Sequence, residues 1–177
     1  MHLILGSQSP RRKEILSYFS MPFEQKTPPF DENSVPFTGD PSAYVHALSK
    51  GKAHSLLATF PDAVILTADT VVYKSGKVYN KPIDLDDAFQ AVSELAGDWH
   101  SVFTGVTVLL GSQEFTGAEE TRVLFNPLTP EQIRHYHQKM EWRDKAGGYA
   151  IQMGGGLVIN RIEEYTGFFC AGKFLRS

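Results

Sequence analysis

A short segment near the start of the chain, Leu3-Ile4-Leu5-Gly6-Ser7-Gln8-Ser9-Pro10-Arg11-Arg12, decides the fold class. Its three large apolar residues predict a buried strand, which the following glycine and serine bring to an end. Ser9 and Pro10 then predict a helix start, because the serine oxygen can accept a hydrogen bond from a free backbone N–H and proline loses none at the first helical position. A strand, a short loop and a helix in this order indicate an α/β domain.

Two arginines follow this helix start and favour an anion beside it. Free N–H groups and the positive end of the helix dipole already attract negative charge there. Arg11 and Arg12 oppose that dipole, so they cost stability unless an anion lies nearby. Phosphate binding and a pair of solvated surface charges are both consistent with the local pattern. A Walker-type phosphate loop is excluded, because G-x-x-x-x-G-K-[ST] does not occur in the sequence.

Helices and strands alternate along the rest of the chain. Asp40-Pro41 and Thr129-Pro130 repeat the capping pattern of the first helix, and a further helix is predicted from Asp84 to a stop at Gly97. Residues 63–66 form a second apolar strand. Glycine-containing turns predict hairpins over residues 71–79, 102–125 and 149–162. This alternation of helices with strands and hairpins predicts a mixed sheet with flanking helices.

The composition argues against several classes of protein. Lys and Arg number 17 against 20 Asp and Glu, a net charge of −3, whereas a nucleic-acid or polybasic membrane binder needs a cationic surplus. Hydrophobic residues make up 42%, enough for a packed core, and no apolar run approaches the roughly 20 residues that span a bilayer. The single cysteine, Cys170, excludes an internal disulfide and a Cys-rich zinc site. We therefore expect a soluble cytoplasmic protein, with a single domain over residues 1–177 and no signal peptide.

Two acidic segments are candidates for chemistry. Asp69 follows the apolar strand over residues 63–66, at the strand end where α/β sheets place ligands. It can hold Mg²⁺, activate a water or cap the following turn, and a cap is the most frequent role of an isolated aspartate there. Asp31 and Glu32 lie in a Pro-rich loop, and this segment considered by itself favours a solvated loop without a chemical role. The combination is of interest, because hard divalent cations take carboxylates from separate segments.

Three further polar residues have two interpretations each. Lys81 follows the first hairpin, and Lys52 falls on the second predicted helix, where a solvated face is the default interpretation. Gln152 ends the segment 144–152, which begins with a charged pair and a glycine hinge. Its amide offers a donor and an acceptor, which suits a nucleobase edge, although a buried structural amide is equally consistent.

Taken in order, these segments resemble the Maf family of nucleoside triphosphate pyrophosphatases. The matching segments are residues 7–16, 31–32, 52–53, 68–72, 81–82, 95–97, 100–102, 104–106 and 144–152. The resemblance runs from residue 3 to about residue 162. It implies a mixed, twisted sheet with flanking helices, two lobes around a substrate cleft, and hydrolysis of a nucleoside triphosphate to the monophosphate and pyrophosphate.

The resemblance also implies roles for individual residues. Asp69 would accept the proton of the attacking water and would join Glu32 as a ligand of a divalent cation (Mg²⁺, Mn²⁺ or Co²⁺), with Asp31 as a weaker candidate. Substrate binding and specificity would rest on Ser9, Arg11, Arg12, Lys52, Thr70, Lys81 and Gln152. Attack of water at the α-phosphorus requires a metal ion that bridges phosphate oxygens and cationic side chains that take up the developing negative charge.

The arginine pair after Ser9-Pro10, together with Thr70 and Gln152, resembles the family branch that acts on dTTP and UTP. This favours a house-cleaning pyrophosphatase for pyrimidine nucleotides. Two alternatives stay open: a pyrophosphatase for 7-methyl-GTP or another purine nucleotide, and a non-catalytic regulator of septum formation. The expected partner is a nucleoside triphosphate, without nucleic acid or membrane, and a homodimer is an open expectation.

The sequence departs from the family pattern from about residue 163. Family members usually continue into a Gly-x-Tyr segment, a turn and a final helix, which residues 161–177 replace. Four apolar residues of this tail either cover the surface that the helix would normally cover or leave an exposed patch: Phe168, Phe169, Phe174 and Leu175. This departure bears on stability, dimer formation and activity.

Overall fold

The computed structural model describes residues 2–151 and 154–164 of the chain. The expectations for Gln152 and for the tail that contains Cys170 therefore lie outside the described residues. The described residues form two compact units. The first holds residues 2–69 and 104–119, and the second holds residues 70–103, 120–151 and 154–164. Each unit is described below by itself.

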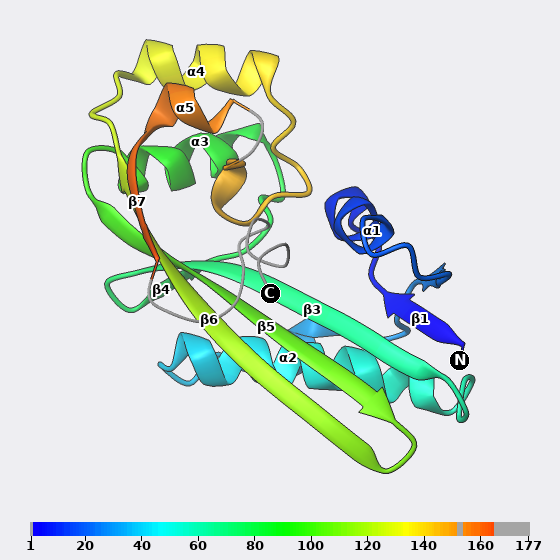
Figure 1. Cartoon of the computed structure of the whole chain (residues 1–177). Helices are drawn as coiled ribbons and strands as arrows, with labels where there is room; N and C mark the ends of the chain where they lie inside the picture. The colour runs from blue at the N-terminus through cyan, green and yellow to red at the C-terminus, as the bar shows by residue number, and fades with distance from the viewer. Residues whose placement is uncertain (1, 152–153, 165–177) are drawn as a thin grey trace. The chain divides into compact units, whose positions relative to one another are not determined.

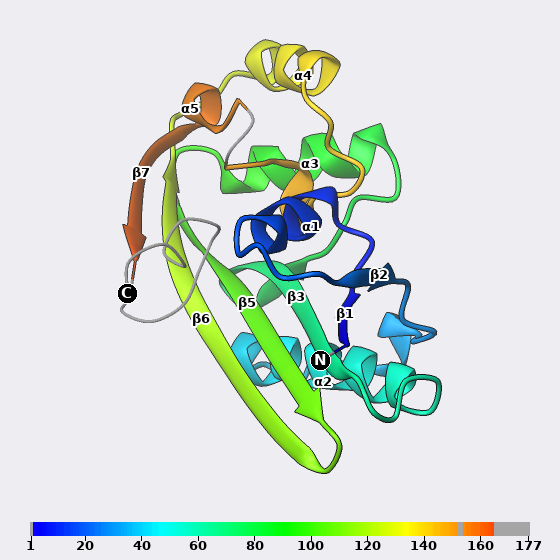
Figure 2. The same ribbon diagram turned by 45° about the vertical axis from the view of Figure 1, so that its right-hand side comes forward.

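The strands form one mixed sheet (Figure 1). Its order is β2 (Glu24–Lys26), β1 (Leu3–Gly6), β3 (Val64–Lys74), β5 (Trp99–Leu110), β6 (Gln113–Phe125) and β7 (Ile159–Glu164), with β4 (Lys77–Tyr79) paired to β3. Strand β1 is parallel to β2 and β3, whereas β4 is antiparallel to β3 and β7 is antiparallel to β6. The long neighbouring strands β5 and β6, joined by a short turn, are clear in Figure 2. The predicted mixed sheet and its first two hairpins are confirmed.

Among the described residues, three helices begin where the capping pairs predicted, a fourth begins after Asp84 as expected, and a short fifth helix was not predicted. They are α1 (Pro10–Ser17), α2 (Pro41–Leu57), α3 (Leu85–Leu95), α4 (Pro130–Lys139) and α5 (Gly155–Val158), with 3₁₀ turns η1 (Glu32–Ser34) and η2 (Ala146–Gly148). The side chains of Ser9, Asp40, Asp84 and Thr129 each accept a hydrogen bond from a backbone N–H in the first turn of the helix that follows. No helix of residues 2–151 and 154–164 is long and apolar enough to cross a membrane.

The third predicted hairpin, over residues 149–162, is wrong. Residues 149–151 form no strand, and Gly154, with a φ of 70°, precedes the short helix α5. Strand β7 then pairs with β6, from which it is far removed in sequence. The glycines thus start a helical turn in place of a hairpin turn. The partner of β7 is the distant strand β6 and not the segment just before it.

The core of the first unit lies on both faces of β1 and β3. Alternate strand residues point to opposite faces. Ile4 and Ile65 pack with Ala53 and Leu56 of α2 on one face, and Leu3 and Leu5 pack with Leu16 of α1 on the other. Helix α2 therefore lies against the sheet (Figure 1).

The second unit contains a buried aromatic cluster. His100, Phe125 and Tyr149 make edge-on contacts, with centroids 4.7 to 5.4 Å apart. The His100 Nε2 lies 2.7 Å from the Tyr149 hydroxyl. Burial lowers the pKa of His100 to about 4. His100 therefore packs as a neutral core residue.

Candidate active site

The first unit brings three predicted site residues together around one ammonium group. The Lys52 Nζ donates to the Asp69 Oδ1 and lies 2.8 Å from the Glu32 Oε1. Lys52 and Asp69 are each 7% exposed. The default interpretation of Lys52 as a solvated helix residue is therefore wrong. Helix α2 turns this side chain inward, toward Asp69 of β3.

Two buried hydrogen bonds hold α2 in this position against the sheet. The Thr67 hydroxyl donates to the Ser49 carbonyl oxygen at 2.7 Å, and the Ser49 and Thr107 hydroxyls lie 2.9 Å apart. Ser49 precedes Lys52 by one helical turn, and Thr67 precedes Asp69 by two strand positions, so both pairs share a face. These contacts fix Lys52 opposite Asp69. The sequence analysis missed Ser49, Thr67 and Thr107. The one signal available for them was that each is a polar residue within an otherwise apolar segment.

Arg12 anchors the first helix next to the same carboxylates. Its Nη1 donates to the Ala68 carbonyl oxygen at 2.8 Å and to the Ser7 Oγ at 3.3 Å. Burial lowers the pKa of Arg12, and the negative charges of Asp69 and Glu32 oppose that shift. The guanidinium group therefore ties the loop after β1 to the strand residue just before Asp69.

The remaining predicted site residues are placed as follows. The Ser9 Oγ accepts from the Arg12 backbone N–H at 3.4 Å, so its hydroxyl caps α1. Arg11 is half-buried in the first turn of that helix. Thr70, also half-buried, and Lys81, exposed, belong to the second unit. The first unit therefore joins Glu32, Lys52 and Asp69 with Arg12 nearby.

The donor set of this cluster fits a divalent cation. Glu32 and Asp69 reach the same ammonium group from η1 and β3, so their oxygens can also reach one metal ion. Carboxylate oxygens are the ligands that Mg²⁺ and Mn²⁺ prefer, and Mg²⁺ completes its shell with waters and substrate phosphates. Within the described part of the chain, no group of three or more His, Cys, Asp and Glu side chains is arranged to hold a metal. Glu32 and Asp69 would be the two carboxylate ligands from this cluster.

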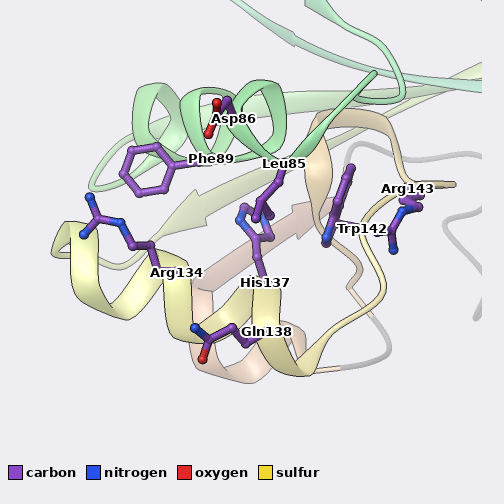
Figure 3. Close-up of a pocket in the computed structure, with 8 residues that line it drawn as sticks. All are labelled: Leu85, Asp86, Phe89, Arg134, His137, Gln138, Trp142 and Arg143. Atoms are coloured by element: carbon purple, nitrogen blue, oxygen red, sulfur yellow. The ribbon is translucent and has the colours of Figure 1, made fainter.

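The second unit holds a cavity of about 530 Å³, shown in Figure 3. It is lined by Leu85, Asp86, Phe89, Arg134, His137, Gln138, Trp142 and Arg143. The Arg134 guanidinium lies 5.1 Å from the Phe89 ring centroid, and that of Arg143 lies 4.5 Å from the Trp142 ring centroid. None of the predicted site residues within the described part of the chain lines this cavity.

The second unit also pairs a buried lysine with an exposed aspartate. Lys145 is 6% exposed, and its Nζ donates to the Asp144 carboxylate beside it in the chain. These two residues are the charged pair that begins the segment 144–152, and the sequence analysis did not expect the lysine to be buried. The burial of this lysine depends on packing that sequence spacing does not reveal.

Comparison with known structures first defines the fold. The structure resembles that of the Staphylococcus aureus Ham1 protein with a TM-score of 0.50 and 8% identity, over 71% of this chain and 72% of that one. At this identity the similarity shows a common fold.

The family follows from the sequence. The model of Maf-like proteins matches residues 2–167, and the chain belongs to the Maf family. A dTTP/UTP pyrophosphatase of Chlamydia caviae is 48% identical over 162 residues, which cover 91% of this chain and 83% of that protein. A dTTP/UTP pyrophosphatase of Clostridium perfringens is 41% identical over 166 residues, covering 92% and 86%. The resemblance drawn from the sequence motifs is confirmed.

Proposed function

We propose that this chain hydrolyses dTTP and UTP to the monophosphate and pyrophosphate, with the help of a divalent cation, in the cytoplasm. The observation that carries the proposal is the buried cluster of Lys52, Asp69 and Glu32, in a Maf protein whose relatives at 48% and 41% identity bear that activity in their names. The net charge of −3 argues against a nucleic acid as the partner.

The chemistry that this site supports is attack of water on the α-phosphorus. The Asp69 carboxylate accepts a proton from the water while the water oxygen bonds to the α-phosphorus. The bond from that phosphorus to the bridging oxygen breaks, and the electron pair leaves with pyrophosphate. A divalent cation, when bound by Glu32 and Asp69, neutralises charge on the phosphate oxygens.

The cationic residues bind the triphosphate in this proposal. Arg12 offers a planar set of donors that matches phosphate oxygens, and Lys52 offers a compact charge beside Asp69. Ser9, Arg11 and Lys81 complete the phosphate contacts, and Thr70 and Gln152 select the pyrimidine base. These cations oppose the charge that develops on the leaving pyrophosphate.

A nucleotide panel tests the substrate class. Purified protein is incubated with dTTP, UTP, CTP, GTP and 7-methyl-GTP in the presence of Mg²⁺, Mn²⁺ or Co²⁺, and pyrophosphate is measured. We expect turnover of dTTP and UTP to exceed that of the other nucleotides. Preference for 7-methyl-GTP or another purine would contradict the substrate assignment. Absence of turnover with every metal, together with binding to a cell-division protein, would favour the regulator of septum formation.

Replacement of Asp69 tests the proposed base. Because a positioned general base contributes about 10²- to 10⁴-fold, Asp69→Asn should lower kcat for dTTP by that factor. Thermal unfolding of the variant serves as the control for folding. An Asp69→Asn protein that stays folded and keeps wild-type turnover would remove Asp69 from this role.

A further inference from the structure

We propose that Lys52 is a positioning residue that keeps Glu32 and Asp69 together and competes with the free divalent cation for their oxygens. Metal and nucleotide consequently bind as a coupled pair. The inference rests on the proposed function in one respect: it takes these two carboxylates as the cation ligands.

The contacts of Lys52 place its charge where a metal ion would need to be. The Nζ reaches the Asp69 Oδ1 and, at 2.8 Å, the Glu32 Oε1. The side chains of Lys52 and Asp69 are each 9% exposed, whereas that of Glu32 is 46% exposed. A cation that binds both carboxylates must therefore displace a largely buried ammonium group from them.

The positive charges of this cluster already match its negative charges, and Arg11 adds a further positive charge that acts on Arg12. Lys52 and Arg12 supply two positive charges, and Glu32 and Asp69 supply two negative charges that act on Arg12 as well. A free divalent cation would add a large positive excess to a buried site, which is unfavourable. A nucleoside triphosphate brings negative charge that removes this positive excess, so the cation binds more favourably together with the nucleotide than alone.

Displacement of the Lys52 ammonium has a second consequence. The side chain is long and unbranched, with a charge that can turn from the carboxylates to phosphate oxygens without leaving the site. In this arrangement Lys52 holds the carboxylates before substrate arrives and binds phosphate after the metal replaces it. Binding of metal and binding of nucleotide then strengthen one another by the same factor.

The test measures binding of Mn²⁺ alone, by electron paramagnetic resonance of the free ion, without nucleotide. Lys52→Met is compared with the matched variant Lys50→Met. Lys50 lies two residues earlier on α2, is 53% exposed at its side chain and pairs with Glu114 at 2.8 Å. Since unit charges in contact inside a protein interact far more strongly than thermal energy, we expect Lys52→Met to bind Mn²⁺ at least about tenfold more tightly than Lys50→Met. Equal or weaker Mn²⁺ binding would overturn the proposal.

Loss of the ammonium group leaves two carboxylates side by side, so Lys52→Met could fail to fold. Lys52→Gln keeps a hydrogen-bond donor without the charge and provides a second variant with the same expected gain. Thermal unfolding gives an independent measure, because a ligand that binds only the folded state raises Tm. Mn²⁺ should raise the Tm of either Lys52 variant more than that of Lys50→Met, and an equal rise would count against the proposal.

A non-hydrolysable α,β-methylene analogue of dTTP tests the coupling. The analogue should tighten Mn²⁺ binding at least about tenfold in the wild type and less in Lys52→Met, because that variant has no ammonium group for the ion to displace. Equal coupling in both proteins would contradict the role of Lys52. Failure of the proposed function is distinguishable, because it shows as absent dTTP turnover in the wild type, whereas failure of this inference shows as unchanged Mn²⁺ affinity in the Lys52 variants.

Discussion

Arg12 illustrates how one side chain can serve both stability and a binding site. Its Nη1 donates to the Ala68 carbonyl oxygen, one residue before Asp69, and its backbone N–H is capped by Ser9. The guanidinium group therefore fixes the strand end as well as presenting charge. A bound phosphate would add to these contacts and would not need to replace them, since guanidinium has five N–H donors.

Arg12→Ala should lower the free energy of unfolding by about 1–3 kcal/mol, because the Ala68 carbonyl and the nearby carboxylates lose a donor. Urea unfolding followed by circular dichroism measures this loss. The control is Lys13→Ala, which removes an exposed charge from the same helix and should change stability by less than about 0.5 kcal/mol. Equal stability of the two variants would show that the Arg12 contact contributes nothing.

At this scale the sequence predicted the residue types of the site but not their pairing. Asp69 and Glu32 were identified as a combination of carboxylates, and Ser9 was expected at a helix start. The contact of Lys52 with both carboxylates joins α2 to β3 and η1, so it depends on how these elements pack. Local spacing cannot show which face of a helix meets a strand that follows it in the chain.

At the scale of elements, the backbone of β5 comes close to α2 at Gly105. A Cβ at this position would lie 2.4 Å from the Val45 carbonyl oxygen, so only glycine lets the helix backbone approach the strand. This approach supports the hydroxyl contact of Ser49 with Thr107, two residues further along β5. The position of α2, and with it that of Lys52, therefore depends on a residue without a side chain.

Gly105→Ala should destabilise the protein by about 1–3 kcal/mol, the usual cost of overpacking. Gly117→Ala on β6 is the matched control, because nothing lies within 4 Å of the Cβ it would add. Chemical unfolding of both variants gives the comparison. A Gly105→Ala protein as stable as Gly117→Ala would mean that α2 and β5 separate at little cost.

The elements that local chemistry determines were predicted well. The cap residues Ser9, Asp40 and Thr129 act within one helical turn, so their helices could be located from the sequence. The hairpin expected over residues 149–162 was wrong, because β7 pairs with β6 and glycines start α5. A run of glycines predicts that the backbone turns, but it does not predict whether a strand or a helix follows.

At the scale of the whole molecule, the buried histidines make stability depend on pH. His100 has a pKa of about 4 in the folded protein, below its ordinary value of 6.5, because burial disfavours its charged form. Between these two values the unfolded chain binds the proton and the folded chain does not. Stability from this group is thus complete above pH 6.5 and is lost as the pH falls toward 4.

From pH 7 to pH 5 the wild type should lose about 2 kcal/mol more unfolding free energy than His100→Gln. Urea unfolding at a series of pH values measures both slopes. Burial lowers the pKa of His137 in the same direction, but that residue is present in both proteins and so does not affect the difference. Parallel slopes for the two proteins would show that His100 takes up its proton in the folded state.

The central claim is that water attacks the α-phosphorus of dTTP with Asp69 as the proton acceptor. Hydrolysis of dTTP in water enriched in ¹⁸O, with both products analysed by mass spectrometry, tests it most directly. We expect one ¹⁸O atom in the monophosphate and unlabelled pyrophosphate, and we expect labelled monophosphate to form about 10²- to 10⁴-fold more slowly when Asp69→Asn replaces the wild type. Label in the pyrophosphate, or release of inorganic phosphate as the first product, would contradict it.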